Sequence, residues 1–121
     1  MTTNKPIHNY QQSLNRTQRT LKTMQNGKLA LQFLDHLGAL GLSLARVTKY
    51  VTHLPPLLRM INTDLKTMTK TDVEAIVAAI NGCDQKEWIK HDKKLALRKL
   101  LQYAKAGSCA KGTPYLMKLA G

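Results

Sequence analysis

Four basic side chains recur along residues 86–105 at a spacing that could bring them together on one partner. They lie four, four and seven positions apart: Lys90, Lys94, Arg98 and Lys105. At about 100° per residue, this spacing places all four on one side of a helix. Because apolar residues occupy another side, we expect this helix to pack inward on a core. Its cationic side would face outward to a polyanion, with nucleic acid the favoured partner.

A second basic stripe lies in the predicted helix over residues 44–54. Opposite its apolar residues it carries three groups that can bond phosphates or bases: Arg46, Lys49 and His53. Beside them, Ala45 and Thr52 are small enough to let the helix come close to a DNA groove. An ordinary solvated basic face has the same composition, so this stripe alone leaves both interpretations open. Two such faces on non-adjacent helices favour DNA binding.

The formal net charge of +12 is concentrated at the two ends of the chain. Residues 1–34 hold five basic side chains and no acid, residues 35–84 hold five of each, and residues 85–121 hold nine basic against two acidic. No lysine or arginine lies within residues 71–85, so the helix predicted there should face away from a polyanion. Three N-terminal cations could form a basic arm along a DNA backbone or belong to a mobile tail, and both remain open: Arg16, Arg19 and Lys22.

The elements that must position these cations are all helices. Each strongly periodic segment repeats its apolar residues at helical spacing, and none alternates like a half-buried strand. We predict helices in five segments, at about 9–25, 28–40, 44–61 with an interruption, 69–82 and 86–105. The fold class is therefore all-α, a compact bundle of four core helices with an additional N-terminal helix or arm.

The chain length of 121 residues suits one domain. We divide it into a basic N-terminal arm or helix at 1–27, the helical domain at 28–105, and a linker at 106–121.

Capping residues predict where three helices begin. Ser43 has the side chain of an N-cap. Thr69 and Asp72 have the spacing of a capping box with aspartate in place of glutamate. Asp84 and Glu87 form a second possible box, which would open the last helix.

Glycine and proline predict where helices end or bend. The predicted stops are at Asn26-Gly27, Gly41 and Gly107. Pro55 and Pro56 interrupt one apolar stripe, and a proline inside a helix removes a backbone hydrogen bond and clashes with the preceding turn. We therefore predict a kink or break near Leu54, followed by a short second helix.

The residue types argue against several other activities. Four histidines are too scattered for a metal site: His8, His36, His53 and His91. No Ser/His/Asp or Cys/His set has convincing spacing, so we expect no metal, no cofactor and no catalysis. Tyr50 and Trp88 are predicted to be core or core-edge residues. With aromatics at 5%, a protein that stacks successive bases of a single strand is disfavoured.

The sequence also indicates a cellular compartment. It has no run of 18 apolar residues that could span a membrane, and its polar start lacks the apolar stretch of a signal peptide. Cys83 and Cys109 stand alone, and we expect reduced thiols in a cytoplasmic protein rather than a disulfide.

Three segments in order resemble a known family. Residues 42–54 contain a "Leu-Ser … Tyr … Leu" helix, residues 64–77 a "Thr-x-x-Asp-Ile/Val" helix start, and residues 87–101 a final basic amphipathic helix. Before them, residues 31–41 resemble a "Phe-Leu-Asp-x-Leu … Gly" helix. In this order and spacing they are similar to the core-binding domain of tyrosine recombinases, especially archaeal phage-type integrases. Lys93, where an aromatic is common, and the Pro55-Pro56 pair depart from the family pattern.

The resemblance implies a four-helix, SAM-like bundle that grips one side of duplex DNA through the helices at 43–54 and 86–105. The implied partners are double-stranded DNA, a separate C-terminal catalytic domain of the same parent chain, and other recombinase protomers on the DNA. None of the four tyrosines has the setting of the family's nucleophile, so we expect the chemistry to lie in that other domain: Tyr10, Tyr50, Tyr103 and Tyr115. A helical protein-interaction module with an acidic target and a small RNA-binding domain remain the alternatives.

Overall fold

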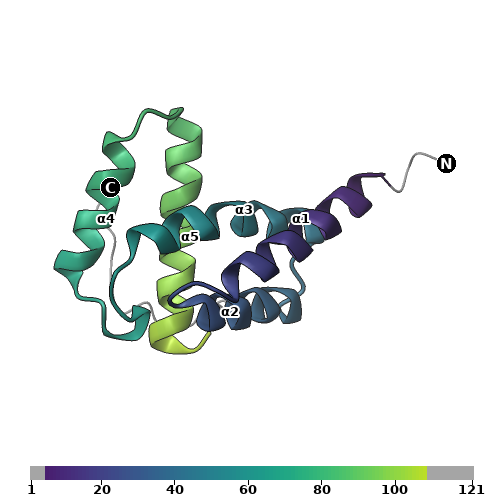
Figure 1. Ribbon diagram of the computed structural model, residues 1–121, viewed down its shortest axis with the longest axis horizontal. Helices are drawn as coiled ribbons and strands as arrows, with labels where there is room; N and C mark the ends of the chain where they lie inside the picture. The colour runs from purple at the N-terminus through teal and green to yellow at the C-terminus, as the bar shows by residue number, and fades with distance from the viewer. Residues whose placement is uncertain (1–4, 109–121) are drawn as a thin grey trace.

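The computed structural model describes residues 5–108, and their side chains from residue 11 onward. Five α-helices and one short 3₁₀ helix make up this part of the chain, which contains no strand (Figure 1). They are α1 (Lys5–Leu21), α2 (Gly27–Ala39), α3 (Leu44–Met60), η2 (Leu65–Thr67), α4 (Lys70–Gly82) and α5 (Glu87–Ala106). The all-α prediction is confirmed. The Tyr10 side chain, Cys109 and most of the predicted linker lie outside the described residues.

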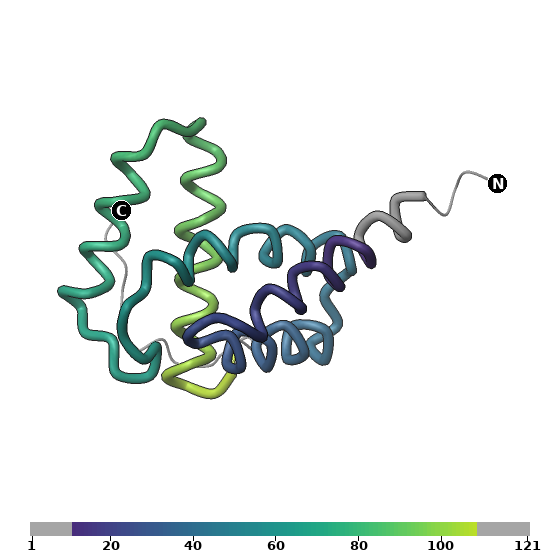
Figure 2. Tube along the Cα trace, viewed as in Figure 1, coloured from purple at the N-terminus to yellow at the C-terminus, as the bar shows by residue number. Residues whose placement is uncertain are grey.

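Two helices organise the bundle. α3 packs on α1, α2 and α5, and α5 also packs on α2, η2 and α4. Figure 2 shows α5 running the height of the molecule, with α4 beside it on one flank, α1 and α2 on the other, and α3 crossing it. The first turns of α5 and the last turns of α4 reach beyond α3 (Figure 1). Neither of these two helices is long and apolar enough to cross a bilayer, and the same holds for the other described helices.

One hydrophobic core joins all the helices. The predicted apolar stripes supply it: Phe33 and Leu37 of α2, Val51 and Leu54 of α3, and Leu97 of α5 are buried. The side chains of α4 that were expected to form its inner face are buried as well, namely Val73, Ile76, Val77 and Ile80. α1 contributes Leu21, which is fully buried, with Leu14 and Met24 packed against the core. The N-terminal segment is therefore docked on the bundle as a helix over its described part.

The turn between α1 and α2 differs from the predicted stop. α1 ends already at Leu21, and Gly27 opens α2. Asn26 adopts a left-handed conformation with φ 65°, and its side chain bonds the backbone of Thr63 and Leu65 at 2.9 and 3.1 Å. A Cβ on Gly27 would lie 1.7 Å from the Leu21 carbonyl oxygen. The glycine is therefore needed for the close approach of two chain segments, and it does not stop a helix.

The predicted break near Leu54 is wrong, because α3 is one helix with Pro55 and Pro56 inside it. Each proline removes one backbone hydrogen bond. Leu54 before the prolines and Leu57 after them are both fully buried in the same core. Packing on both sides of the defect offsets the missing bonds and keeps the helix continuous.

The predicted caps have mixed outcomes. The Ser43 hydroxyl accepts the Arg46 N–H at 3.3 Å, and Thr69 and Asp72 form a complete capping box, as predicted. The box at Asp84 is wrong, because α5 begins at Glu87 after Lys86, without a side-chain cap. The Gln85 N–H donates to the Cys83 carbonyl at 3.0 Å, so residues 83–85 form a turn before the helix.

Two of the three predicted glycine signals match the structure. Gly41 and Gly107 both have positive φ, at 87° and 79°. Each follows the end of a helix, where a left-handed residue terminates the hydrogen-bond ladder.

Candidate nucleic-acid interface

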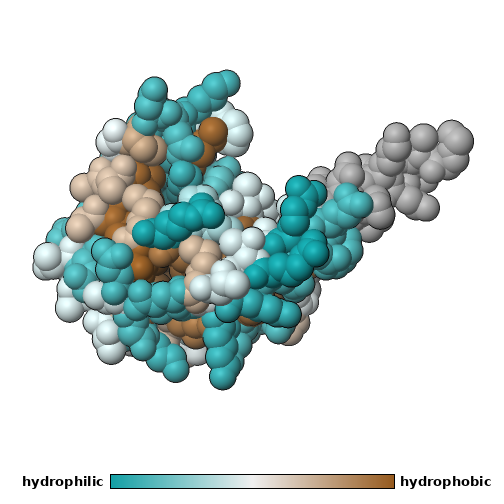
Figure 3. Space-filling model, in the orientation of Figure 1, coloured by the Kyte–Doolittle hydropathy of each residue, from teal (hydrophilic) through white to brown (hydrophobic). Residues whose placement is uncertain are grey.

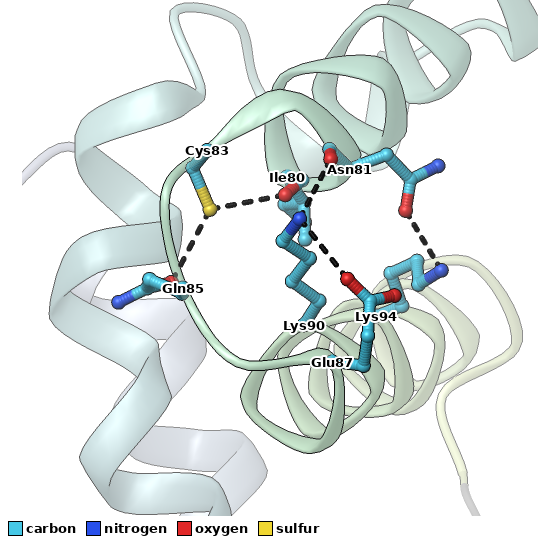
Figure 4. A network of polar contacts seen from close by, with 7 residues as sticks. All are labelled: Ile80, Asn81, Cys83, Gln85, Glu87, Lys90 and Lys94. Atoms are coloured by element: carbon cyan, nitrogen blue, oxygen red, sulfur yellow. Dashed lines mark hydrogen bonds and ion pairs between the residues drawn. The ribbon is translucent and has the colours of Figure 1, made fainter.

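Two of the four expected α5 cations lie against the end of α4 (Figure 4). Lys90 Nζ donates to the Asn81 carbonyl at 2.9 Å and pairs with Glu87 at 3.3 Å. Lys94 Nζ donates to Asn81 Oδ1 at 2.8 Å. The Lys90 side chain is only 12% exposed. The last carbonyls of a helix lack intrahelical partners and carry negative partial charge, so Lys90 caps α4. Lys94 bonds the side chain of the same residue, so both amines are turned towards the end of α4 instead of facing outward as expected.

A third expected cation, Lys105, also bonds within the molecule. Its Nζ donates to the Met68 carbonyl at 2.8 Å and to the Lys66 carbonyl at 3.3 Å. The contacts tie the last turn of α5 to η2 and the residues after it. Arg98, the fourth member of the set, is exposed. The expectation of one outward cationic side on α5 is therefore corrected for Lys90, Lys94 and Lys105, while Arg98 keeps an exposed position.

The α3 stripe lies beside the first half of α5. Arg46 is exposed, and Lys49 pairs with Asp92 of α5 at 3.3 Å while half of its side chain stays exposed. Lys49 and His53 share an open groove of about 460 Å³ with Thr52 and Pro56 of α3. The segment 85–93 supplies the other wall: Gln85, Trp88, Ile89, Asp92 and Lys93. We call this feature the α3–α5 groove.

His53 is half-buried in the α3–α5 groove, and its pKa is lowered from the ordinary 6.5. Burial is the largest cause, because it disfavours the charged imidazolium. The Asp92 carboxylate opposes this shift, whereas the positive charges of Lys93 and Lys49 add to it. The imidazole is therefore neutral at neutral pH and can offer one donor and one acceptor.

Trp88 corrects another expectation, because 63% of its surface is exposed. It lies in the first turns of α5, the part of the helix that reaches beyond α3 (Figure 1). A polar loop precedes it, and the apolar periodicity of the helix begins only after it. The exposure of Trp88 could therefore have been predicted from its place before the apolar repeat of the helix. Tyr50 is buried and stacks edge-to-face on Phe33 with centroids 6.3 Å apart, in agreement with its predicted core role.

Lys93 lies on the core-facing arc of α5, at its outer end. Its stem is half-buried and its Nζ donates to Gln85 Oε1 at 2.7 Å. The amine therefore emerges at the rim of the α3–α5 groove. The sequence analysis did not include Lys93 among the binding residues. Its position could have been expected, because long lysine side chains often pack their methylene groups while the amine reaches water.

Other basic side chains lie elsewhere on the surface. Arg16, Arg19 and Lys22 are exposed on or just after α1. Lys28 and Lys66 line a second open groove, which sequence reasoning had not identified. α4 carries no cation after its first residue. The small apolar side chains that it exposes instead are Ala75, Ala78 and Ala79. Figure 3 shows the surface over α4 as the more hydrophobic part of the face in view.

Among the described residues, no three His, Cys, Asp or Glu side chains gather where they could hold a metal ion. Cys83 is a free thiol that donates to the Ile80 carbonyl at 3.0 Å. No family model, curated protein or solved structure matches the chain.

Proposed function

We propose that this chain is the duplex-DNA-binding core-binding domain of a site-specific tyrosine recombinase and that it grips one side of the recombination site. In this proposal α2 to α5 correspond to the SAM-like four-helix bundle and α1 is the additional helix. The catalytic domain of the parent chain and other protomers on the DNA are its partners. The chain itself performs no chemistry and works in the cytoplasm.

The observation that carries the proposal is the arrangement of cations around the α3–α5 groove. Lys49 comes from α3 and Lys93 from α5, and both border the same open groove. Arg46 continues the α3 stripe at an exposed position one turn earlier. Basic groups from two helices that are distant in sequence thus meet at one surface, as a DNA backbone contact requires.

The exposed side of α3 is also suited to close approach. Ala45 and Thr52 are exposed and small, so no bulky side chain protrudes between the cations and keeps the helix away from DNA. Arg46 can bond a guanine edge or a phosphate, and Lys49 can bond phosphate. Lys49 pairs with Asp92 at 3.3 Å while half of its side chain stays exposed, so its amine remains open to a phosphate. Arg98 is exposed on α5 as well, but it lies on the side of the helix that it shares with Lys90, Lys94 and Lys105, so it is not part of this surface.

Lys90, Lys94 and Lys105 have a supporting role in this proposal. Their amines are held by backbone and side-chain oxygens of α4 and the η2 region. They fix α5 against these elements, and α5 in turn presents the groove. The proposed DNA contacts are therefore Arg46, Lys49, His53 and Lys93.

A duplex titration tests the proposal. The chain should bind a labelled duplex with a Kd of about 10⁻⁴–10⁻⁶ M near physiological salt, the range of non-specific binding. Arg46→Glu should weaken binding by at least about tenfold, because it replaces an attraction to phosphate with a repulsion. The matched control is Lys70→Glu, which makes the same charge change at an exposed site at the start of α4.

Fluorescence anisotropy supplies the readout, with circular dichroism to check that both variants fold. Equal losses for Arg46→Glu and Lys70→Glu would show that net charge alone drives binding and would overturn the interface. Absence of binding even at low salt, or tighter binding to structured RNA than to duplex DNA, would overturn the DNA proposal itself.

A further inference from the structure

We propose that the α3–α5 groove holds one unpaired nucleobase of a DNA duplex, stacked on Trp88, with a neighbouring phosphate on the lysines of the rim. This inference rests on the proposed DNA-binding function and adds the chemical class of ligand that the groove selects.

The first observation is the exposed indole. Trp88 is 63% exposed, and among residues 11–108 it is the one exposed Phe, Tyr or Trp side chain. Aromatic side chains such as tryptophan are enriched at interaction surfaces. Pro56 and Ile89 line the same groove and extend its apolar surface.

The second observation is the charge at the rim. Lys49 and Lys93 lie at the groove, and Asp92 is the one carboxylate among its lining residues. Asp92 already pairs with Lys49 at 3.3 Å, whereas Lys93 is held by the neutral amide oxygen of Gln85 at 2.7 Å. The groove thus combines an apolar ring with a net positive rim. Its complement is a flat apolar group that carries a negative charge close by.

A nucleotide has this combination, because a base stacks on an aromatic ring while its phosphate binds a cation. The groove, at about 460 Å³, lies within the size range of small-ligand sites. Trp88 is the one exposed Phe, Tyr or Trp among residues 11–108 and the one such ring that lines the groove, so the groove suits one base and not a run of stacked bases. An unpaired base within a duplex agrees with the single aromatic ring and with the duplex contacts proposed for the neighbouring α3 stripe.

The experiment compares three labelled duplexes of the same sequence. One is fully paired, one has a single extra thymine, and one has an extra abasic residue at the same position. The abasic duplex is bent and flexible like the thymine duplex but lacks the base. Stacking on an aromatic side chain strengthens binding by about 5- to 150-fold per base, so the thymine duplex should bind at least about fivefold more tightly than the abasic one.

Trp88 is the only tryptophan of the chain, so its intrinsic fluorescence reports on the groove directly. We expect the thymine duplex to quench this fluorescence more strongly than the abasic duplex. In Trp88→Ala, the ratio of the two affinities should fall to about one. The matched control is Leu40→Ala, which removes the other large exposed hydrophobic side chain of residues 11–108 and should leave the ratio unchanged.

Equal affinities of the wild-type chain for the thymine and abasic duplexes would overturn the inference, even though both bind. Failure to bind any of the three duplexes would instead overturn the proposed function. A preference for thymine that survives in Trp88→Ala would place the base elsewhere and would also overturn the assignment of this groove.

Discussion

Single residues at this protein's turns and grooves are constrained by contacts with other elements of the fold. Gly27 faces the Leu21 carbonyl, and Asn26 bonds the chain near η2. His53 is kept neutral by the burial that its groove imposes. An added methyl group at Gly27 or a proton on His53 should therefore change the free energy of unfolding, and each gives a specific prediction.

We predict that Gly27→Ala lowers the free energy of unfolding by about 1–3 kcal/mol, because the added methyl group overlaps a backbone oxygen that cannot move aside cheaply. Urea unfolding measures the change. Gly38→Ala is the control, since a Cβ there meets nothing within 4 Å. Gly38 lies inside α2, and alanine there should raise the free energy of unfolding by up to about 1 kcal/mol. Similar effects of the two substitutions would contradict this account of Gly27.

His53 predicts a pH dependence of stability. Its pKa is lower in the folded chain than the ordinary 6.5, so below that pH the unfolded chain binds more protons than the folded one. The free energy of unfolding should therefore fall as the pH drops from about 6.5 towards the folded pKa, and level off below it. His53→Gln should remove this part of the pH dependence between about pH 7.5 and pH 5. If the urea midpoint changes with pH in the same way for the wild-type chain and for His53→Gln, His53 is not the source of the pH dependence.

At the scale of the elements, α5 has neighbours on several sides, and each side uses its lysines differently. On the α4 side, Lys90 caps the end of the helix and Lys94 bonds the Asn81 side chain beside it. On the α3 side, Lys93 reaches the groove. Residues that share one charge and one helix thus divide between stabilising the fold and presenting a surface.

This division predicts that two matched substitutions affect different properties, one mainly stability and the other mainly DNA binding. Lys90→Met leaves the Asn81 carbonyl without its donor and should lower the free energy of unfolding by about 1 kcal/mol. Lys93→Met removes the same charge from the rim of the groove and should weaken duplex binding more than Lys90→Met does, with a smaller loss of stability. Urea unfolding and anisotropy on both variants make the comparison. Equal losses of binding would show that the two lysines are equivalent on DNA.

For the whole molecule, one core holds helices from every part of the chain, while charge is distributed unevenly over its outside. Among the described side chains, α1 and α3 carry several exposed cations and α5 carries Arg98, whereas α4 exposes alanines after its first residue, Lys70 (Figure 3). A net charge of +12 would attract DNA from any direction, but only some cations can contact phosphates at once.

The salt dependence of binding separates these two contributions. Binding through Arg46, Lys49 and Lys93 should give a slope of log K against log[salt] of about −3, at about −0.9 per phosphate. A slope near −10 would mean that most of the net charge engages DNA and would contradict a localised interface. Titrations at several salt concentrations with one duplex are sufficient.

The sequence by itself determined the class of fold and most helix boundaries. Apolar spacing and the caps at Ser43 and at Thr69 with Asp72 act within one or two turns, so they can be recognised without knowledge of the rest of the chain. The unbroken α3 could not be recognised in this way, because burial of Leu54 and Leu57 on a distant core outweighs the local effect of the prolines.

Only the tertiary structure decided how the candidate site is built. Helical spacing gives the angle of each side chain about its own axis, but it does not say which neighbour lies at that angle. α5 packs on α3 and on α4, and this packing turned Lys90 and Lys94 towards a helix end, brought Lys93 to the groove, and left Trp88 exposed beyond α3. The partners of a surface cation are set by long-range packing, which no local pattern contains.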